Sequence, residues 1–280
     1  MSRGKKSLIK SLRLKEIILM TGFSFIGILF TETQTWNNWL KNITVFVFVL
    51  CYVMAVYFLN SFADYENDIQ SKRLKIIGNL SKTNYFTLLV VFGILFSLLA
   101  ISININVFVF CILAFLLWLI YYLPPLRLKS SYLLGTLVHF TAGIFHFHTG
   151  YCSYNTYNLG SMAISVYFAL LLSVGHFHHE IIDYESDKVS GSKTTAVRIG
   201  INKMHLLRTT LSGFTLIYWI TIYLTGFTDK IEFGLFFIPT ATLLVMSGIM
   251  REKEVKIFQN SSRSMFLIAG FLLLIIKTIF

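Results

Sequence analysis

The feature of this sequence that most constrains its fold is a series of long apolar blocks separated by short polar stretches. Each block has roughly the 17–25 residues that an α-helix needs to cross a bilayer. Nine blocks can be traced, at about 14–31, 41–59, 84–103, 105–122, 132–150, 160–179, 206–226, 231–250 and 264–280. A segment in lipid must satisfy its own backbone hydrogen bonds, so the sequence predicts an all-α, polytopic membrane protein of about nine transmembrane helices.

The distribution of charge favours a membrane protein over a nucleic-acid-binding one. The net charge is +11, but if the N-terminus is cytoplasmic, 21 of the 24 basic residues fall on one side of the nine spans. This asymmetry is the positive-inside bias that orients membrane proteins. We therefore expect an integral protein of the cell (inner) membrane, with the N-terminus and the charged loops in the cytoplasm. No cleavable signal peptide is evident, and neither nucleic acid nor a protein partner is predicted.

Acidic residues gather in two matched stretches that follow apolar blocks on the predicted cytoplasmic side. The first is "NSFADYENDIQSKR" (60–73) and the second is "HHEIIDYESDKVSGSKTTAVRIG" (178–200). Asp64 and Asp183 are 119 residues apart, as are Asp68 and Asp187. We expect a single membrane-embedded domain over 1–280. The repeated spacing hints at two related four-helix halves, about 14–122 and 132–250, plus a final helix.

The spacing within each stretch predicts a metal site. Residues at i and i+4 share a helix face, so one stripe holds Asn60, Asp64 and Asp68, and the other holds Asp183 and Asp187. Facing carboxylates at the edge of a bilayer repel one another unless a cation lies between them. Oxygen ligands suit a hard cation, and Mg²⁺ prefers carboxylates together with substrate phosphates. All five residues are candidate Mg²⁺ ligands, and the four aspartates are the candidate catalytic residues.

Basic and polar side chains beside the acids are those expected to bind a polyphosphate. "YYLPPLRLKS" places two cations after a pair of prolines, and both acidic stretches are followed by further cations. A tyrosine at the end of the fourth block could form a wall of the site. The candidate substrate-binding residues are Asn60, Lys72, Arg73, Tyr122, Arg127, Lys129, His179, Glu180, Lys188, Thr194 and Arg198.

Together these motifs resemble the UbiA superfamily of integral membrane prenyltransferases. The chain contains N-x-x-x-D-x-x-x-D as "NSFADYEND" and D-x-x-x-D as "DYESD", and "DKVSGSKTTAVRIG" is similar to a further family stretch. The resemblance implies nine helices around a central cavity and Mg²⁺ ions that bridge the diphosphate of an isoprenyl donor. It also implies an allylic carbocation that is captured by an acceptor. Many members carry Asp directly after the first Asn, where this chain has Ser61.

Several functions remain open on the sequence alone. The first is transfer of an isoprenyl group from an allylic diphosphate to a lipophilic acceptor, an aromatic quinone precursor or a carotenoid or polyprenoid, with release of pyrophosphate. The second is a terpene cyclase of the same superfamily without a second substrate, although the presence of Asp64 favours transfer. A haem farnesyltransferase fits the first motif, but the intact Asp183/Asp187 pair argues against it. A transporter is disfavoured because its charges would lie near the bilayer midplane.

The histidines allow two interpretations. Most of the seven fall in the fifth and sixth blocks, including His139, His146, His176 and His178. They could pack between helices or support the carboxylates. Alternatively, one of them could be the base that removes the final proton.

Overall fold

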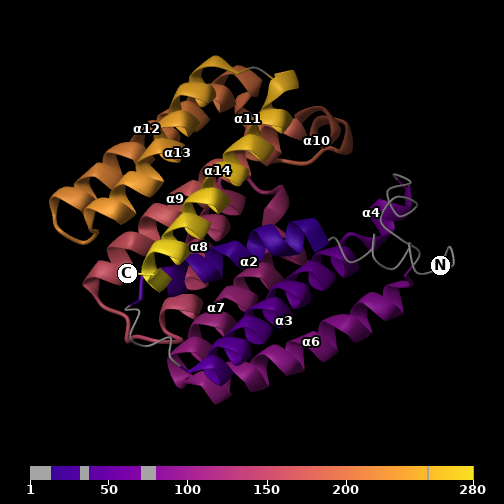
Figure 1. The fold of residues 1–280 in the computed structure, drawn as a ribbon. Helices are drawn as coiled ribbons and strands as arrows, with labels where there is room; N and C mark the ends of the chain where they lie inside the picture. Colours follow the sequence, from indigo (N-terminus) through magenta and orange to yellow (C-terminus); the bar gives the residue numbers. More distant parts are fainter. Residues whose placement is uncertain (1–13, 32–37, 71–79, 251, 280) are drawn as a thin grey trace, which may run out of the picture.

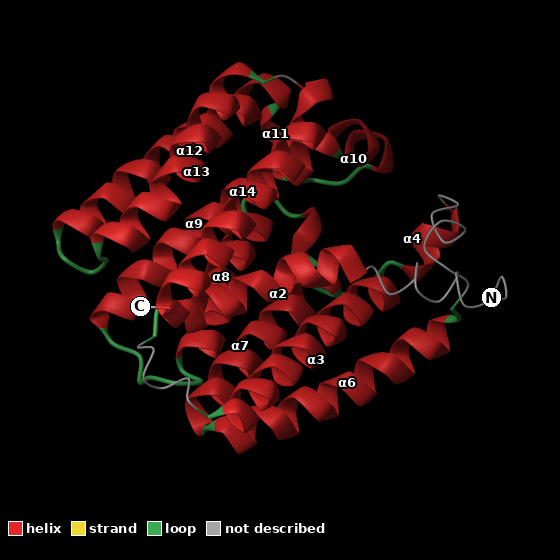
Figure 2. Cartoon of the chain, in the orientation of Figure 1, coloured by secondary structure: helices red, strands yellow, loops and turns green. Residues whose placement is uncertain are grey.

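The computed structural model describes residues 14–31, 38–70, 80–250 and 252–279, and this part of the chain forms helices and loops only (Figure 2). The elements are α2 (Leu14–Leu29), α3 (Trp39–Ala63), α4 (Tyr65–Gln70), α6 (Lys82–Ile103), α7 (Ile105–Tyr122), η2 (Leu128–Ser130), α8 (Leu134–Tyr151), α9 (Leu159–Ile182), α10 (Tyr184–Ser190), α11 (Thr195–Ile199), α12 (Ile201–Leu224), α13 (Lys230–Ile249) and α14 (Glu252–Ile279). The short helices α4 and α10 lie at one end of the bundle, away from the C-terminus (Figure 1). The all-α prediction is confirmed.

Polar caps fix where several long helices begin. The side chains of Asn38, Ser81 and Asn104 each accept a hydrogen bond from the backbone N–H three residues later. Asn158 and Asp229 form full capping boxes at the starts of α9 and α13. Such caps satisfy N–H groups that have no partner within the helix. The apolar blocks therefore become helices with defined first turns.

The structure supports part of the nine-span prediction. Every predicted block overlaps a helix, and six helical segments among the described residues are long and apolar enough to cross a membrane. They are α3, α6, α7, α9, α13 and the part of α14 from Ile257 to Ile279. Blocks 14–31, 132–150 and 206–226 correspond to α2, α8 and α12, which are not among the six. The count of nine spans stays a prediction.

Glycines bring α2 and α8 into backbone contact. A Cβ atom at Gly150 would lie 1.8 Å from the carbonyl oxygen of Ser24, and one at Gly27 would lie 2.0 Å from the carbonyl oxygen of Phe147. The hydroxyl groups of Ser24 and Thr149 are 3.3 Å apart and share a hydrogen bond. Small residues allow membrane helices to approach this closely and to pack without gaps. The register of α8 against α2 is therefore fixed by small residues at positions where a larger side chain would not fit.

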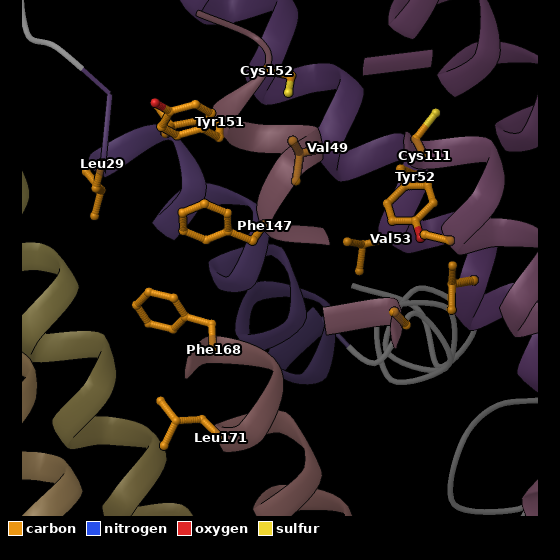
Figure 3. Packing of buried hydrophobic residues seen from close by; sticks show 14 of the residues in the cluster. Leu29, Val49, Tyr52, Val53, Cys111, Phe147, Tyr151, Cys152, Phe168 and Leu171 are labelled. Carbon is orange, nitrogen blue, oxygen red and sulfur yellow. The ribbon is translucent and has the colours of Figure 1, made fainter. Parts of the chain in front are cut away.

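An aromatic core holds α8 against α9. The rings of Phe147 and Phe168 stack with centroids 5.7 Å apart, and both side chains are buried. Figure 3 shows these two rings between the helices, with Tyr52 and Val53 of α3 nearby. Phe168 also meets Phe236 of α13 edge to face. Because such pairs have preferred geometries, the core orients the ends of α8 and α9, which carry the polar groups described next.

Candidate functional site

The two long helices that carry the acidic motifs are interrupted at matching aspartates. Helix α3 ends at Ala63 and α9 ends at Ile182, and the next residues, Asp64 and Asp183, have ψ values of 5° and 2°. These ψ values differ from the helical value near −42°, so the backbone turns at each aspartate before the short helix that follows. Continuous helical stripes were expected. Instead, the turns place each aspartate at a helix end.

The loop between α7 and α8 brings two cations to the first acidic motif. Arg127 has a left-handed backbone, with φ 38° and ψ 56°. Its Nη2 donates to Oδ1 of Asp64 at 3.3 Å, and Lys129 Nζ contacts the same oxygen. The Lys129 ammonium also lies 5.7 Å from the centre of the Tyr122 ring. These cations, predicted to bind a polyphosphate, here neutralise a predicted metal ligand.

The second acidic motif faces the same cations. Burial and the charge of Asp183 raise the pKa of Asp187, and Glu180 raises it further. The nearby Thr194 hydroxyl and the Lys129 ammonium lower this pKa. Lys129 therefore lies close enough to act on the carboxylates of both motifs. The two motifs converge on one region at this end of the bundle.

A tyrosine on α7 marks the same convergence. The Tyr121 hydroxyl lies within electrostatic range of Asp64 from the first motif and of Glu180 and Asp187 from the second. The neighbouring Tyr122 stacks on Trp118 with ring centroids 5.9 Å apart. Aromatic rings therefore lie on the bundle side of the acidic region. Positive charge that develops near these rings would be stabilised by their faces.

The donor set fits a hard cation. Burial, and then repulsion from Asp183 and Glu180, raise the pKa of Asp187, so the second motif disfavours uncompensated negative charge. Carboxylate oxygens are the ligands that Mg²⁺ takes in proteins. Within the described part of the chain, no three His, Cys, Asp or Glu side chains are already grouped as an ion would require. Asn60 lies in the last turn of α3. The side chain of Asp68 lies outside what the structure describes, so the complete ligand set stays a prediction.

Two predicted substrate-binding residues make contacts within the protein. Glu180 is buried: its Oε2 accepts from the backbone N–H of Ala196 at 2.8 Å, and its Oε1 lies 3.0 Å from Nε2 of His176. The Glu180 carboxylate thus ties α9 to the first turn of α11. The Nε2 of His179 lies 2.7 Å from Nη2 of Arg263 on α14. These contacts place both side chains among neighbouring helices at the motif end of the bundle.

The remaining predicted cations lie around the acidic region or outside the described residues. Arg198 lies over the Tyr132 ring at 4.7 Å, and Lys188 lies 6.0 Å from the centre of the Tyr184 ring. Both are carried by the short helices that follow α9. Lys72 and Arg73 belong to residues 71–79, outside the described part of the chain.

A stacked pair of histidines lies between α8 and α9, and it was not predicted from the sequence. His139 of α8 and His176 of α9 stack with ring centroids 4.0 Å apart and an interplanar angle of 19°. The edges of Trp118 and Tyr121 meet the His139 ring at 5.2 and 5.0 Å. The clustering of histidines in the two blocks was the available signal, but it could not identify which rings meet.

A buried arginine was also missed, although Arg208 falls inside the predicted block 206–226. The structure places it inside α12 with no exposed surface. Its Nη2 donates to the carbonyl oxygens of Ser247 and Met250 at 2.6 and 3.2 Å, whereas Nε and Nη1 have no hydrogen-bond partner. The guanidinium thus caps the C-terminal end of α13. A basic residue inside a predicted span was the signal that could have identified it.

Comparison with known proteins was made for sequence and for fold. A model of the UbiA prenyltransferase family matches residues 20–272. No curated protein matches the chain. The fold is similar to that of a UbiA homologue from Archaeoglobus fulgidus bound to DMAPP and Mg²⁺. The TM-score is 0.75 and the identity 17%, and the match covers 98% of this chain and 100% of that one.

Two further solved structures share the fold. The apo structure of a UbiA homologue from Aeropyrum pernix K1 has a TM-score of 0.75 and 17% identity, covering 95% of this chain and 99% of that one. A digeranylgeranylglyceryl phosphate synthase has a TM-score of 0.74 and 17% identity, covering 97% of this chain and 98% of that one. At these identities the likeness is one of fold.

Proposed function

Because the chain belongs to the UbiA prenyltransferase family, we propose that it transfers an isoprenyl group from an allylic isoprenyl diphosphate to a lipophilic acceptor and releases pyrophosphate. The observation that carries the proposal is the position of Lys129. Its ammonium contacts Asp64 and also acts on Asp187, so cations and carboxylates of both motifs share one region. A metal-bound diphosphate requires this combination of charges.

The metal set proposed for Mg²⁺ consists of Asn60, Asp64, Asp68, Asp183 and Asp187. When bound, Mg²⁺ would neutralise charge on the departing diphosphate. The homologue from Archaeoglobus fulgidus that is bound to DMAPP and Mg²⁺ supports this assignment by analogy of fold. In this chain the carboxylates would hold the ions near the ends of α3 and α9, where Asp64 and Asp183 lie.

The basic residues are proposed to bind the diphosphate oxygens. Arg127 and Lys129 lie closest to the acids, and their donors match phosphate as well as carboxylate. Lys188 and Arg198, on the short helices that follow α9, and the Thr194 hydroxyl beside Asp187 belong to the same proposed set. Lys72 and Arg73 complete the proposed set. These groups stabilise the negative charge that builds as the C–O bond of the donor breaks.

The aromatic side chains are proposed to face the carbocation that remains. Tyr122 stacks on Trp118, and its ring lies 5.7 Å from the ammonium of Lys129, which is proposed to bind the diphosphate. Such faces attract a cation and exclude water from it. The acceptor proposed is an aromatic quinone precursor or a carotenoid or polyprenoid. The domain is proposed to span the whole chain as two related halves and a final helix, with the acidic end on the cytoplasmic side of the cell membrane.

Release of pyrophosphate tests the proposal directly. Purified protein in detergent would receive C10 to C20 allylic diphosphates and Mg²⁺, with and without a membrane lipid extract. Mg²⁺-dependent release that requires the extract supports transfer, and mass spectrometry of the product identifies the acceptor. Release without any acceptor, giving a cyclic product, would show a terpene cyclase instead.

A pair of variants at the start of α10 separates the loss of a metal ligand from the loss of a negative charge. Asp183→Asn should abolish release, because it removes a proposed metal ligand. Glu185→Gln removes one negative charge two residues later, in the first turn of α10, and should leave release unchanged. Absence of release by the wild-type protein under every condition, or full release by Asp183→Asn, would contradict the proposal.

A further inference from the structure

We propose that His139 is the base that removes the proton from the acceptor after the isoprenyl group has bonded to it. The inference rests on the proposed function and names a residue for a step that the acidic motifs do not perform. It starts from the stacked histidine pair, which lies inside the bundle next to the acidic region. His139 comes from α8 and its partner His176 from α9.

The hydrogen bond of His139 defines which ring nitrogen can accept a proton. Its Nδ1 lies 2.8 Å from the carbonyl oxygen of Gly135, one turn earlier on α8. A carbonyl oxygen can only accept, so Nδ1 carries the hydrogen. In the neutral ring the lone pair therefore lies on Nε2. The residue is partly exposed rather than sealed in the core, and the proposal assigns this nitrogen to the acceptor.

The ring lies where the carbocation would form. Tyr121 meets His139 edge to face at 5.0 Å, and the same tyrosine is within electrostatic range of Asp64 and Asp187. Trp118 also meets the His139 ring, with centroids 5.2 Å apart, and it stacks on Tyr122. One aromatic layer thus separates the histidine from the acidic region. A base in this position reaches the acceptor without reaching the diphosphate.

A carboxylate behind the pair compensates for the charge gained. His176 Nε2 lies 3.0 Å from Glu180 Oε1, and Glu180 is fixed by the backbone N–H of Ala196. A Cβ atom at Gly135 would lie only 3.2 Å from His176 Nε2, so glycine allows the two histidines to pack this closely. His176 is therefore a positioning residue. It orients His139 by stacking and connects it to negative charge.

The groups that face His139 can be named from every neighbouring element. They are Tyr121 from α7, His146 from α8 itself, and His176 and His179 from α9. A positive charge on any of the three histidines would oppose protonation of His139. Glu180, behind His176, is the negative group nearest to the pair.

The step balances without any further reactant. The donor C–O bond breaks, and its electron pair leaves with the pyrophosphate. The acceptor supplies the electrons of the new bond to the isoprenyl carbon. An X–H bond of the acceptor, with X carbon or oxygen, then breaks, its electron pair stays on the acceptor, and the proton moves to Nε2 of His139. Release of this proton to water restores the neutral ring.

The test uses a substitution that keeps the local hydrogen bond. In His139→Asn the side-chain amide can still donate to Gly135, but the second ring nitrogen is gone. With radiolabelled geranyl diphosphate, Mg²⁺ and the lipid extract, coupled product should fall about 10²- to 10⁴-fold. The KM for the donor should not change, and label should divert to geraniol as water captures the cation.

His148→Asn is the matched control, because its Nδ1 also lies 2.9 Å from the carbonyl one turn earlier, that of Ile144. It lies nine residues along α8, about 13 Å from His139, and its ring stacks on Phe110. Coupled product should be unchanged in this variant. Thermal unfolding in detergent checks that both proteins are folded.

Chemical rescue distinguishes a base from a space-filling ring. Imidazole added to His139→Ala should restore coupled product, whereas pyrrole, a ring of the same size without a basic nitrogen, should not. Normal coupling in His139→Asn, or equal rescue by imidazole and pyrrole, would overturn the role of His139 as the base but would leave the proposed function standing. A wild-type protein that releases no pyrophosphate would overturn the proposed function and this role with it.

Discussion

Replacing Lys129 by methionine should change the binding of Mg²⁺ and of the donor in opposite directions. In the ligand-free protein the Asp64 carboxylate is already held by Lys129 and Arg127. An incoming Mg²⁺ must therefore displace these cations or accept their repulsion. The donor diphosphate, in contrast, gains from the same ammonium. We expect Mg²⁺ alone to bind more tightly to Lys129→Met, and the donor to bind more weakly.

The size of each effect follows from the burial of the pair. The side chains of Lys129 and Asp64 are 20% and 22% exposed, so their interaction lies between the limits of about 1 kcal/mol in water and about 4 kcal/mol near a protein surface. In Lys129→Met an incoming Mg²⁺ no longer has to displace the ammonium from Asp64, and we expect its binding free energy to improve by about 1 to 2 kcal/mol. This corresponds to Mg²⁺ binding about 5- to 30-fold tighter. One charge-assisted hydrogen bond to the diphosphate, worth about 1.5–3 kcal/mol, corresponds to a donor KM about 10- to 150-fold higher.

Calorimetric titration of EDTA-treated protein with Mg²⁺ measures the first constant, and pyrophosphate release measures the second. Lys82→Met is the matched control, because Lys82 pairs with Glu66 at the same end of the bundle, at 3.0 Å, in an exposed position. Such exposed pairs contribute little, so neither constant should move more than about twofold. Weaker Mg²⁺ binding by Lys129→Met, or a parallel change of both constants, would refute the reasoning.

Three further predictions concern stability, measured by thermal unfolding in detergent. Gly150→Ala should cost about 3 kcal/mol, because its Cβ would overlap the Ser24 carbonyl oxygen, whereas Gly234→Ala, with open space around it, should stabilise α13 by up to about 1 kcal/mol; equal effects would contradict the close crossing. Arg208→Ala should destabilise by about 2 kcal/mol, since the Met250 carbonyl loses its side-chain donor and the Ser247 carbonyl keeps only that of Thr209, and an unchanged melting temperature would show that this cap is dispensable. Burial raises the pKa of Asp187, so the stability that this group contributes is present below the pKa of the unfolded chain and is lost as the pH rises through the pKa of the folded protein. In EDTA, Asp187→Asn should not show this loss. Parallel pH profiles of wild type and variant would disprove the raised pKa of Asp187.

The long apolar blocks predicted the helices because the length of an apolar run is a local property of the sequence. The block 41–59 became α3 at Trp39–Ala63, and 105–122 became α7 with the same bounds. The turns at Asp64 and Asp183 were not predicted, since i, i+4 spacing is compatible with a straight helix. A change in ψ at one residue leaves no periodic trace, and only the tendency of Asp to occupy helix ends pointed to it.

The contacts within the candidate site depend on tertiary structure. That Arg127 would be near acids was predicted, but its pairing with Asp64 requires a left-handed backbone in the connecting loop. The stacking of His139 on His176 needs two helices in a given register, which the sequence of either helix does not specify. Arg208 shows the opposite case, because its position inside an apolar block was visible and its partners on α13 were not.

The backbone contact between α2 and α8 has a consequence for how a lipid could reach the interior. Because α2 and α8 touch at Gly27 and Gly150, they cannot separate without opening a void, so we expect them to move as one rigid unit. A molecule arriving sideways from the bilayer must then slip between other helices. Because α2 and α8 are locked together, a tilt of α2 would also move α8, and His139 on α8 would shift with it.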